Sequence, residues 1–339
     1  MMSVPVEFGL ILALTIRGLA LTSYDQMRVV SQRAEALGFD SIWLCDHFLT
    51  LSAGSYAKDA GMEGRPAAGG ARSDAEQTSM PLLECWTTLS ALARDTRRLR
   101  LGTSVLCNSY RSPSVLAKMA ATLDVISEGR LELGLGAGWF EREYEAYGIP
   151  FPKTSVRIAQ MDEGVEVIRR MWTDAYPTFK GTHYTIDGAI CDPPPVQRPH
   201  PPIWIGGEGD KVHRVAARVA DGINVRWWPP ERFVQRNAFL EEACREHGRD
   251  PARLRRSLTA LLAPSRERAA VEAQRRRFAA IPAAGLIVGT PQECVARILE
   301  YRKAGVTHFL FTIPDVEELD MLEVTGREVL PAVRAVTNP

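Results

Sequence analysis

The sequence has no excess of charge of either sign. Its 339 residues include 41 basic and 41 acidic side chains, so the formal net charge at pH 7 is zero. Nucleic-acid binding depends on a surplus of Lys and Arg that can neutralise phosphates. The richest basic run, at residues 275–277, lies among alanines in a predicted helix and is expected to face solvent. We therefore expect no nucleic-acid partner.

Paired cysteines and long apolar runs are also lacking. The six cysteines are scattered, and none recurs at the C-x-x-C spacing that is typical of zinc sites. We therefore expect free thiols in a reducing compartment and no metal centre. The apolar run at residues 10–14 is too short for a signal peptide or a membrane span. These absences predict a cytoplasmic protein with no membrane partner.

Short apolar segments alternate with helical patterns along the whole chain. Eight segments have the composition of buried strands, and they lie at residues 8–14, 40–45, 99–106, 130–135, 203–205, 222–225, 257–262 and 308–313. Helical periodicity occurs at residues 25–37, 82–94, 113–126, 154–172 and 319–336, and Thr290 and Pro291 have the residue types of a helix start. This alternation predicts an α/β fold, a single (β/α)8 TIM barrel domain over residues 1–339.

Two stretches depart from the alternation, as insertions after strands 2 and 4. Residues 51–80 are rich in glycine, alanine and serine without periodicity, which predicts a mobile insertion that acts as a lid. Residues 175–201 form a proline-rich excursion in which residues 179–186 are predicted to form a small hairpin.

A dinucleotide-binding fold is the main alternative to the barrel. The run Gly134-Leu135-Gly136-Ala137-Gly138 is rich in glycine and follows a predicted strand. Its spacing is G-x-G-x-G, however, whereas the dinucleotide fingerprint is G-x-G-x-x-G near the start of a βαβ unit. The spacing and the mid-chain position both favour the barrel.

Asp46 and His47 directly follow the second predicted strand. In a barrel, this position lies at the mouth of the active site. Histidine titrates near neutral pH, so His47 could exchange a proton during catalysis and is our candidate catalytic residue. The structural alternative is that His47 forms a hydrogen bond with Asp46 or with the base of the 51–80 insertion.

Two glycine-rich turns follow other strands. Gly136-Ala137-Gly138 removes side-chain bulk where a flat ring could approach the backbone, although a tight strand–helix turn would explain it as well. Gly206-Gly207-Glu208-Gly209 precedes a helix and could present successive N–H groups to a phosphate, or it could be a plain turn. A carboxylate repels phosphate, so a phosphate site requires the Glu208 side chain to point away.

Charged and aromatic residues follow the fourth and sixth strands. Glu141 and Glu143 begin a predicted helix, where acidic side chains suit the helix dipole, so no catalytic role follows from them. Arg226-Trp227-Trp228 could line a substrate or cofactor groove, or could belong to an interface or pack under a loop.

Several segments resemble the luciferase-like monooxygenase superfamily, and within it the coenzyme F420-dependent oxidoreductases. The resemblance extends from about residue 8 to residue 333, and the matching segments are residues 46–48, 101–106, 117–127, 129–139, 146–152 and 201–207. It implies a TIM barrel that transfers a hydride between C5 of F420 and a small organic substrate. The deazaflavin ring would lie beside Asp46 and His47, and its phosphate would lie on residues 206–209.

The resemblance also implies details of the site. In the F420-binding relatives, the peptide bond at the position of Ser104-Val105 is cis and forms a bulge behind the ring. The sequence alone indicates only a buried strand end at this position. Trp139 stands where the sugar-phosphate dehydrogenases of the group have a glutamate, and Leu14-Thr15 where they have a lysine, so glucose 6-phosphate is not the expected substrate. Relatives are commonly dimers, which implies a homodimer. Residues 82–92 are one candidate surface, although ordinary packing on the barrel would explain their composition as well.

Three alternatives stay open. The same fold could bind reduced FMN and act as a monooxygenase that uses O2. A metal-dependent barrel hydrolase using Asp46 and His47 is a remote alternative, because no H-x-H pair accompanies them. The chain could also bind a cofactor without turning over a substrate.

Overall fold

Eight parallel strands close into a barrel in the computed structural model, which describes residues 5–13, 21–50 and 81–337. In the order of their pairing the strands are β1 (Glu7–Ala13), β2 (Ser41–Leu44), β3 (Arg100–Thr103), β5 (Leu131–Gly136), β8 (Ile203–Gly206), β9 (Gly222–Arg226), β10 (Arg255–Pro264) and β12 (His308–Thr312). Pairing of β12 with β1 closes the ring. This architecture confirms the predicted TIM barrel. The predicted lid at residues 51–80 lies outside the described residues.

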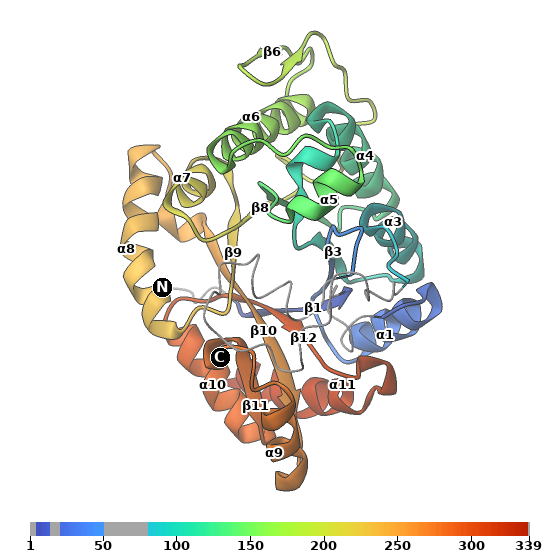
Figure 1. Cartoon of the computed structure of the whole chain (residues 1–339), viewed down its shortest axis with the longest axis vertical. Helices are drawn as coiled ribbons and strands as arrows, with labels where there is room; N and C mark the ends of the chain where they lie inside the picture. The colour runs from blue at the N-terminus through green and yellow to red at the C-terminus, as the bar shows by residue number, and fades with distance from the viewer. Residues whose placement is uncertain (1–4, 14–20, 51–80, 338–339) are drawn as a thin grey trace.

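Helices surround the ring of strands (Figure 1). The helices are α1 (Tyr24–Ala36), α3 (Cys85–Asp95), α4 (Pro113–Ile126), α5 (Glu141–Ala146), α6 (Thr154–Thr173), α7 (Asp210–Val219), α8 (Pro230–Glu246), α9 (Arg268–Arg277), α10 (Pro291–Lys303), α11 (Asp320–Val324) and α12 (Leu330–Thr337). Their starts follow local chemistry. Ser23 with Gln26, and Thr290 with Glu293, form capping boxes that satisfy the first N–H groups of α1 and α10.

Several elements differ from the sequence prediction, which also named no helix over the residues of α8. The third strand is broken, because β3 ends at Thr103 and β4 (Leu106–Cys107) resumes the pairing with β5. A short strand outside the barrel, β11 (Leu286–Gly289), pairs with the end of β10. The predicted last helix is divided into α11, a π-helical turn over Thr325–Val329, and α12.

The barrel interior is filled at the amino ends of the strands. Trp43 and Trp204 pack edge to face with ring centroids 5.8 Å apart. A Cβ atom on Gly102 would lie 2.2 Å from the Trp43 ring, so only glycine admits this indole. Beside them the buried Glu132 pairs with Arg100 and Arg255. The remaining space inside the barrel therefore lies at the carboxyl ends of the strands.

The excursion at residues 175–201 lies outside α6 (Figure 1). The predicted hairpin is confirmed, since β6 (Phe179–Lys180) pairs antiparallel with β7 (Thr185–Ile186). The Glu163 carboxylate of α6 accepts hydrogen bonds from the backbone N–H groups of residues 182–184 and anchors the hairpin turn. No helix in the described ranges is both long and apolar enough to cross a membrane.

Candidate active site

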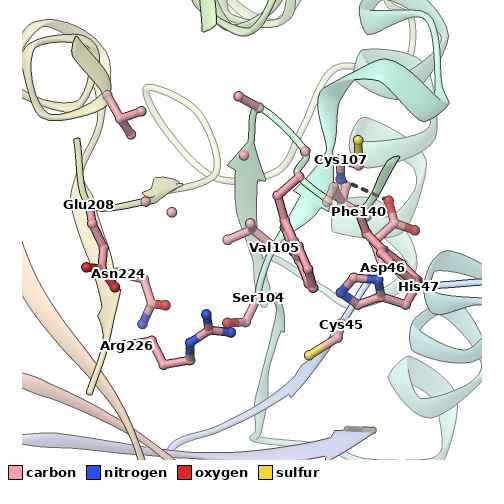
Figure 2. A pocket seen from close by; sticks show the side chains of 18 of the residues that line it. Cys45, Asp46, His47, Ser104, Val105, Cys107, Phe140, Glu208, Asn224 and Arg226 are labelled. Carbon is pink, nitrogen blue, oxygen red and sulfur yellow. Dashed lines mark hydrogen bonds between the residues drawn. The ribbon is translucent and has the colours of Figure 1, made fainter. Parts of the chain in front are cut away.

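A cavity of about 420 Å³ opens at the carboxyl ends of the barrel strands (Figure 2). Its size is in the range of small-molecule sites. Every predicted site residue except Gly209 lines it, namely Asp46, His47, Ser104, Val105, Gly136, Ala137, Gly138, Gly206, Gly207 and Glu208. The loops after four different strands thus meet in one place, as barrel topology requires.

The Ser104–Val105 peptide bond is cis, as the resemblance implies. It occupies the break between β3 and β4, and the Val105 side chain stands in the cavity (Figure 2). Two glycines make room for it. A Cβ atom on Gly136 would lie 2.7 Å from Val105 Cγ2, and one on Gly206 would lie 2.8 Å from Val105 Cγ1. Val105 is therefore seated between β5 and β8 only because both neighbours lack side chains.

His47 is held by a carboxylate that sequence reasoning did not connect with it. Glu143 of α5 is fully buried, and its Oε2 lies 2.9 Å from His47 Nδ1. The same carboxylate accepts the Tyr110 O–H at 2.8 Å and the backbone N–H groups of Phe48 and Leu49 at 2.7 and 2.9 Å. An ionised carboxylate can only accept, so Nδ1 carries a proton and Nε2 is the nitrogen available to a ligand.

The protonation of this cluster follows from its surroundings. Burial alone would raise the pKa of Glu143, but hydrogen bonds from His47, Leu49 and Tyr110 bring that pKa below its ordinary value. Burial and the nearby charge of Glu143 raise the pKa of Tyr110, so its hydroxyl stays a donor. Glu143 is therefore an anion at neutral pH and accepts the hydrogen bond of His47 Nδ1.

Asp46 lines the cavity, but its oxygens are already engaged. Arg111 donates to both of them, at 2.8 and 3.0 Å, and the backbone N–H of Cys107 donates to Oδ2 at 3.0 Å. Arg111 also pairs with Glu84, the residue that caps the amino end of α3. Asp46 thus ties the end of β2 to β4 and to α3. Within the described ranges, no group of three His, Cys, Asp or Glu side chains could hold a metal ion.

The loop at residues 206–209 is fixed from both sides. The Glu208 carboxylate accepts the Trp228 indole N–H at 2.9 Å and pairs with Arg232 at 3.3 Å, so a cation offsets its charge. Beneath the loop lies the buried His213, whose ring has its Nε2 3.2 Å from the Gly207 carbonyl oxygen. Backbone N–H groups in such a loop before α7 suit an anion.

The tautomer of His213 follows from its second contact. Arg236 can only donate, so His213 Nδ1, 2.8 Å from its guanidinium, accepts, and Nε2–H donates to Gly207. Burial and the positive charge of Arg236 lower the pKa of His213 to about 4. The ring is therefore neutral at pH 7 and acts as a support for the loop.

A polar patch lies on the β9–β10 side of the cavity. Asn224 Nδ2 donates to the hydroxyls of Ser257 and Thr259, at 2.9 and 3.2 Å. Arg226 follows Asn224 at the same face of β9 and also lines the cavity, while Trp228 is buried. The alternation of polar Asn224 and Arg226 with apolar neighbours is the sequence signal for an inward-facing polar pair. Sequence reasoning noted Arg226 but missed Asn224 and Thr259.

Known proteins resemble this chain along most of its length. The model of a family described as luciferase-like monooxygenase matches residues 6–284. An F420-dependent glucose-6-phosphate dehydrogenase of Beutenbergia cavernae is 30% identical over 336 residues, which cover 89% of this chain and 91% of that protein.

Solved structures share the fold at lower identity. An F420-dependent secondary alcohol dehydrogenase, solved with an F420–acetone adduct, superposes with a TM-score of 0.76 at 23% identity, over 97% of this chain and 99% of the other. A riboflavin lyase, solved with modified FMN and riboflavin, gives a TM-score of 0.78 at 18% identity, over 98% and 92% of the two chains.

Proposed function

The chain belongs to the luciferase-like monooxygenase family, and from this premise we propose that it is a coenzyme F420-dependent oxidoreductase. The proposed reaction is hydride transfer between C5 of the deazaflavin and a small organic substrate. The observation that carries the proposal is the Val105 side chain, which stands in the cavity at the break between β3 and β4 and is seated between Gly136 and Gly206. The relatives named for F420 dependence support this cofactor.

The residues around the cavity fit a flat ring with a phosphate-bearing tail. Gly136 and Gly138 line the cavity beside Val105 with backbone alone, and a flat ring would lie against that surface. The N–H groups of residues 207–209 would receive the phosphate, supported by His213 and with Glu208 neutralised by Arg232. The backbone beside Val105 would contact the ring, and the loop at residues 207–209 would contact the phosphate.

The proposed mechanism assigns proton transfer to His47. When bound, reduced F420 supplies a hydride. In the oxidising direction, His47 Nε2 would accept the proton of the substrate hydroxyl, which leaves the ring positively charged, and in the reducing direction the charged ring would return that proton to the substrate oxygen. Glu143, 2.9 Å from Nδ1, orients the ring and stabilises its positive charge.

A second candidate keeps the cavity and changes the cofactor to FMN, with O2 as co-substrate. The superposition on the riboflavin lyase solved with modified FMN favours it.

The hydrolase alternative loses its basis, because Arg111 and Cys107 already form hydrogen bonds with Asp46. We do not extend glucose 6-phosphate from the relatives, because Trp139 lines the cavity where the sugar-phosphate dehydrogenases have a glutamate. Leu14-Thr15, which stands where those dehydrogenases have a lysine, lies outside the described residues.

We also propose that the protein is a cytoplasmic homodimer. Light scattering tests the dimer.

Separate titrations with F420 and FMN, followed by tryptophan fluorescence, test the cofactor. We expect micromolar binding of F420 and much weaker binding of FMN. Binding of FMN alone would replace the proposal with the O2-using candidate, and binding of neither would refute both. Tight F420 binding without turnover on a broad panel of alcohols and carbonyl compounds would indicate a cofactor-binding protein without catalysis.

A further inference from the structure

A separate cavity of about 440 Å³ lies at the amino ends of the barrel strands, whereas the active cavity opens at their carboxyl ends. Arg256 and Thr307, at the starts of β10 and β12, line it, and the Thr307 N–H donates to the Arg256 carbonyl oxygen at 3.0 Å. Asn237 and Glu241 of α8 form another part of the wall, beside the 3-10 turn Pro251–Arg253. The cavity therefore joins α8, β10 and the loop before β12.

Arg256 brings a buried cation into this wall, since it is only 9% exposed. Its Nε–H donates to the Asn237 side-chain oxygen at 3.3 Å, and its Nη1 donates to the carbonyl oxygens of Pro251 and Leu254. Among the described residues, none accepts from Nη2 and no carboxylate pairs with the guanidinium. Burial lowers the pKa of Arg256, but a guanidinium stays charged at neutral pH. A buried charge without a counter-ion is costly.

The other charged side chains of the wall have partners of their own. Glu241 pairs with Arg245 at 3.1 Å, and Arg255 pairs with two glutamates. The exposed Asp250 accepts a backbone N–H of the 3-10 turn at 3.0 Å. Among the described residues that line the cavity, Arg256 is therefore the guanidinium without a carboxylate partner.

Thr307 adds a second polar group that needs a partner. Its hydroxyl oxygen is buried and forms no hydrogen bond with the described part of the chain. Buried hydroxyl groups in proteins normally have a partner, either in the protein or in a bound molecule. The apolar side chains of Pro251 and Ala252 line the same cavity. The wall thus combines a cation, a hydroxyl donor and an apolar surface.

We propose that this cavity binds a small organic carboxylate, held by Arg256 and Thr307. A carboxylate supplies the one negative charge that Arg256 lacks, and its oxygens can accept from Nη2 and from the Thr307 hydroxyl. The apolar body of the molecule would lie against Pro251 and Ala252. A phosphate dianion fits less well, because two carboxylates already line the wall. The site is independent of the proposed cofactor, which would occupy the cavity at the other end of the barrel.

Calorimetric titrations at constant ionic strength compare benzoate with benzamide, which has nearly the same shape and no charge. The wild type should bind benzoate more tightly by about tenfold or more. Arg256→Gln should abolish this preference. Asn237→Asp should abolish it as well, because the new carboxylate would lie beside Arg256 Nε and supply the missing negative charge. Arg253→Gln removes an exposed arginine of the same turn that does not line the cavity, and this matched control should behave as the wild type.

Diffraction from crystals soaked in para-bromobenzoate locates the bound molecule, because bromine scatters anomalously. Its carboxylate should lie within hydrogen-bond distance of Arg256 Nη2. Bromobenzoate bound only in the active cavity overturns the inference, and so does equal binding of benzoate and benzamide by the wild type. An undiminished preference in Asn237→Asp overturns it too. Thermal unfolding of each variant checks folding, and Asn237→Asp keeps the arginine in place if Arg256→Gln is unstable.

Discussion

Replacement of Glu143 by glutamine should move the proton of the His47 ring from one nitrogen to the other. In the structure, Oε1 accepts the N–H groups of Phe48 and Leu49, and Oε2 accepts from His47 Nδ1 and Tyr110. Backbone N–H groups only donate, so the amide oxygen of glutamine must stay with them. The amide NH2 then faces Nδ1, which must become an acceptor, and the ring proton moves to Nε2.

The magnitude follows from the change of a charged acceptor to a neutral one. A hydrogen bond to a charged group contributes about 1.5–3 kcal/mol, whereas a neutral bond contributes about 0.5–1.5 kcal/mol. For the two backbone bonds at Phe48 and Leu49, the loss amounts to about 2 kcal/mol in the free energy of unfolding. Catalysis should suffer more, because general acid–base transfer contributes about 10²–10⁴ in rate. We expect kcat of Glu143→Gln to fall by about 10² or more.

Nitrogen-15 NMR of histidine-labelled protein measures the tautomer directly, and His47→Gln identifies the signals of His47. The wild type should show Nδ1 protonated at neutral pH, and Glu143→Gln should show Nε2 protonated. Glu145→Gln, an exposed residue two positions later on α5, is the matched control and should keep the wild-type tautomer. An unchanged tautomer in Glu143→Gln would refute the assigned geometry.

Three further predictions test the rest of the site. Gly206→Val places a Cβ 2.8 Å from Val105 Cγ1 and should weaken F420 binding in a fluorescence titration by about tenfold or more. Gly209→Ala, where a Cβ meets nothing within 4 Å, should weaken F420 binding far less. Equal effects of the two variants would contradict the role given to Val105 and its neighbouring glycines. His213 has a pKa of about 4 in the folded protein, whereas an ordinary histidine has a pKa of 6.5. As the pH falls, the unfolded state therefore binds the proton before the folded state does. The free energy of unfolding should drop by about 3 kcal/mol between pH 6.5 and pH 4. Urea unfolding should show that His213→Gln lacks this loss in the free energy of unfolding at acid pH. If His213→Gln and the wild type depend on pH equally, the assignment of a neutral buried ring is wrong. Arg111→Met leaves the buried Asp46 charge without its cation and should cost about 3–5 kcal/mol in denaturant unfolding, with a loss below about 1 kcal/mol as the contradicting result.

The barrel could be predicted because its strands are short apolar runs separated by helical periodicity. The same logic placed His47 and the glycine turns at one edge, since parallel strands bring their carboxyl ends together. The carboxylate that accepts the hydrogen bond of His47 could not be predicted from the sequence. Glu143 lies 96 residues along the chain, at the start of a helix where an acidic residue already had a local explanation. Only the folded chain shows that its carboxylate is buried and points at the ring.

Other differences have equally local causes. The strand β11 has only four residues, with alternate positions buried, and it pairs outside the barrel, so its apolar signal is weak. The last predicted helix contains a π turn at Thr325–Val329, where a Cβ atom on Gly326 would lie 2.5 Å from Leu37 Cβ. Close packing of Gly326 on the residue that ends α1 is a tertiary contact that helical periodicity does not encode.

A crystal structure of the protein with F420 would show where the coenzyme binds. The deazaflavin ring should lie in the cavity with one face against Val105 and with His47 beside it. The phosphate should lie within hydrogen-bond distance of the backbone N–H groups of residues 207–209. A coenzyme bound outside this cavity, or one whose phosphate lies away from that loop, would refute the proposed cofactor site.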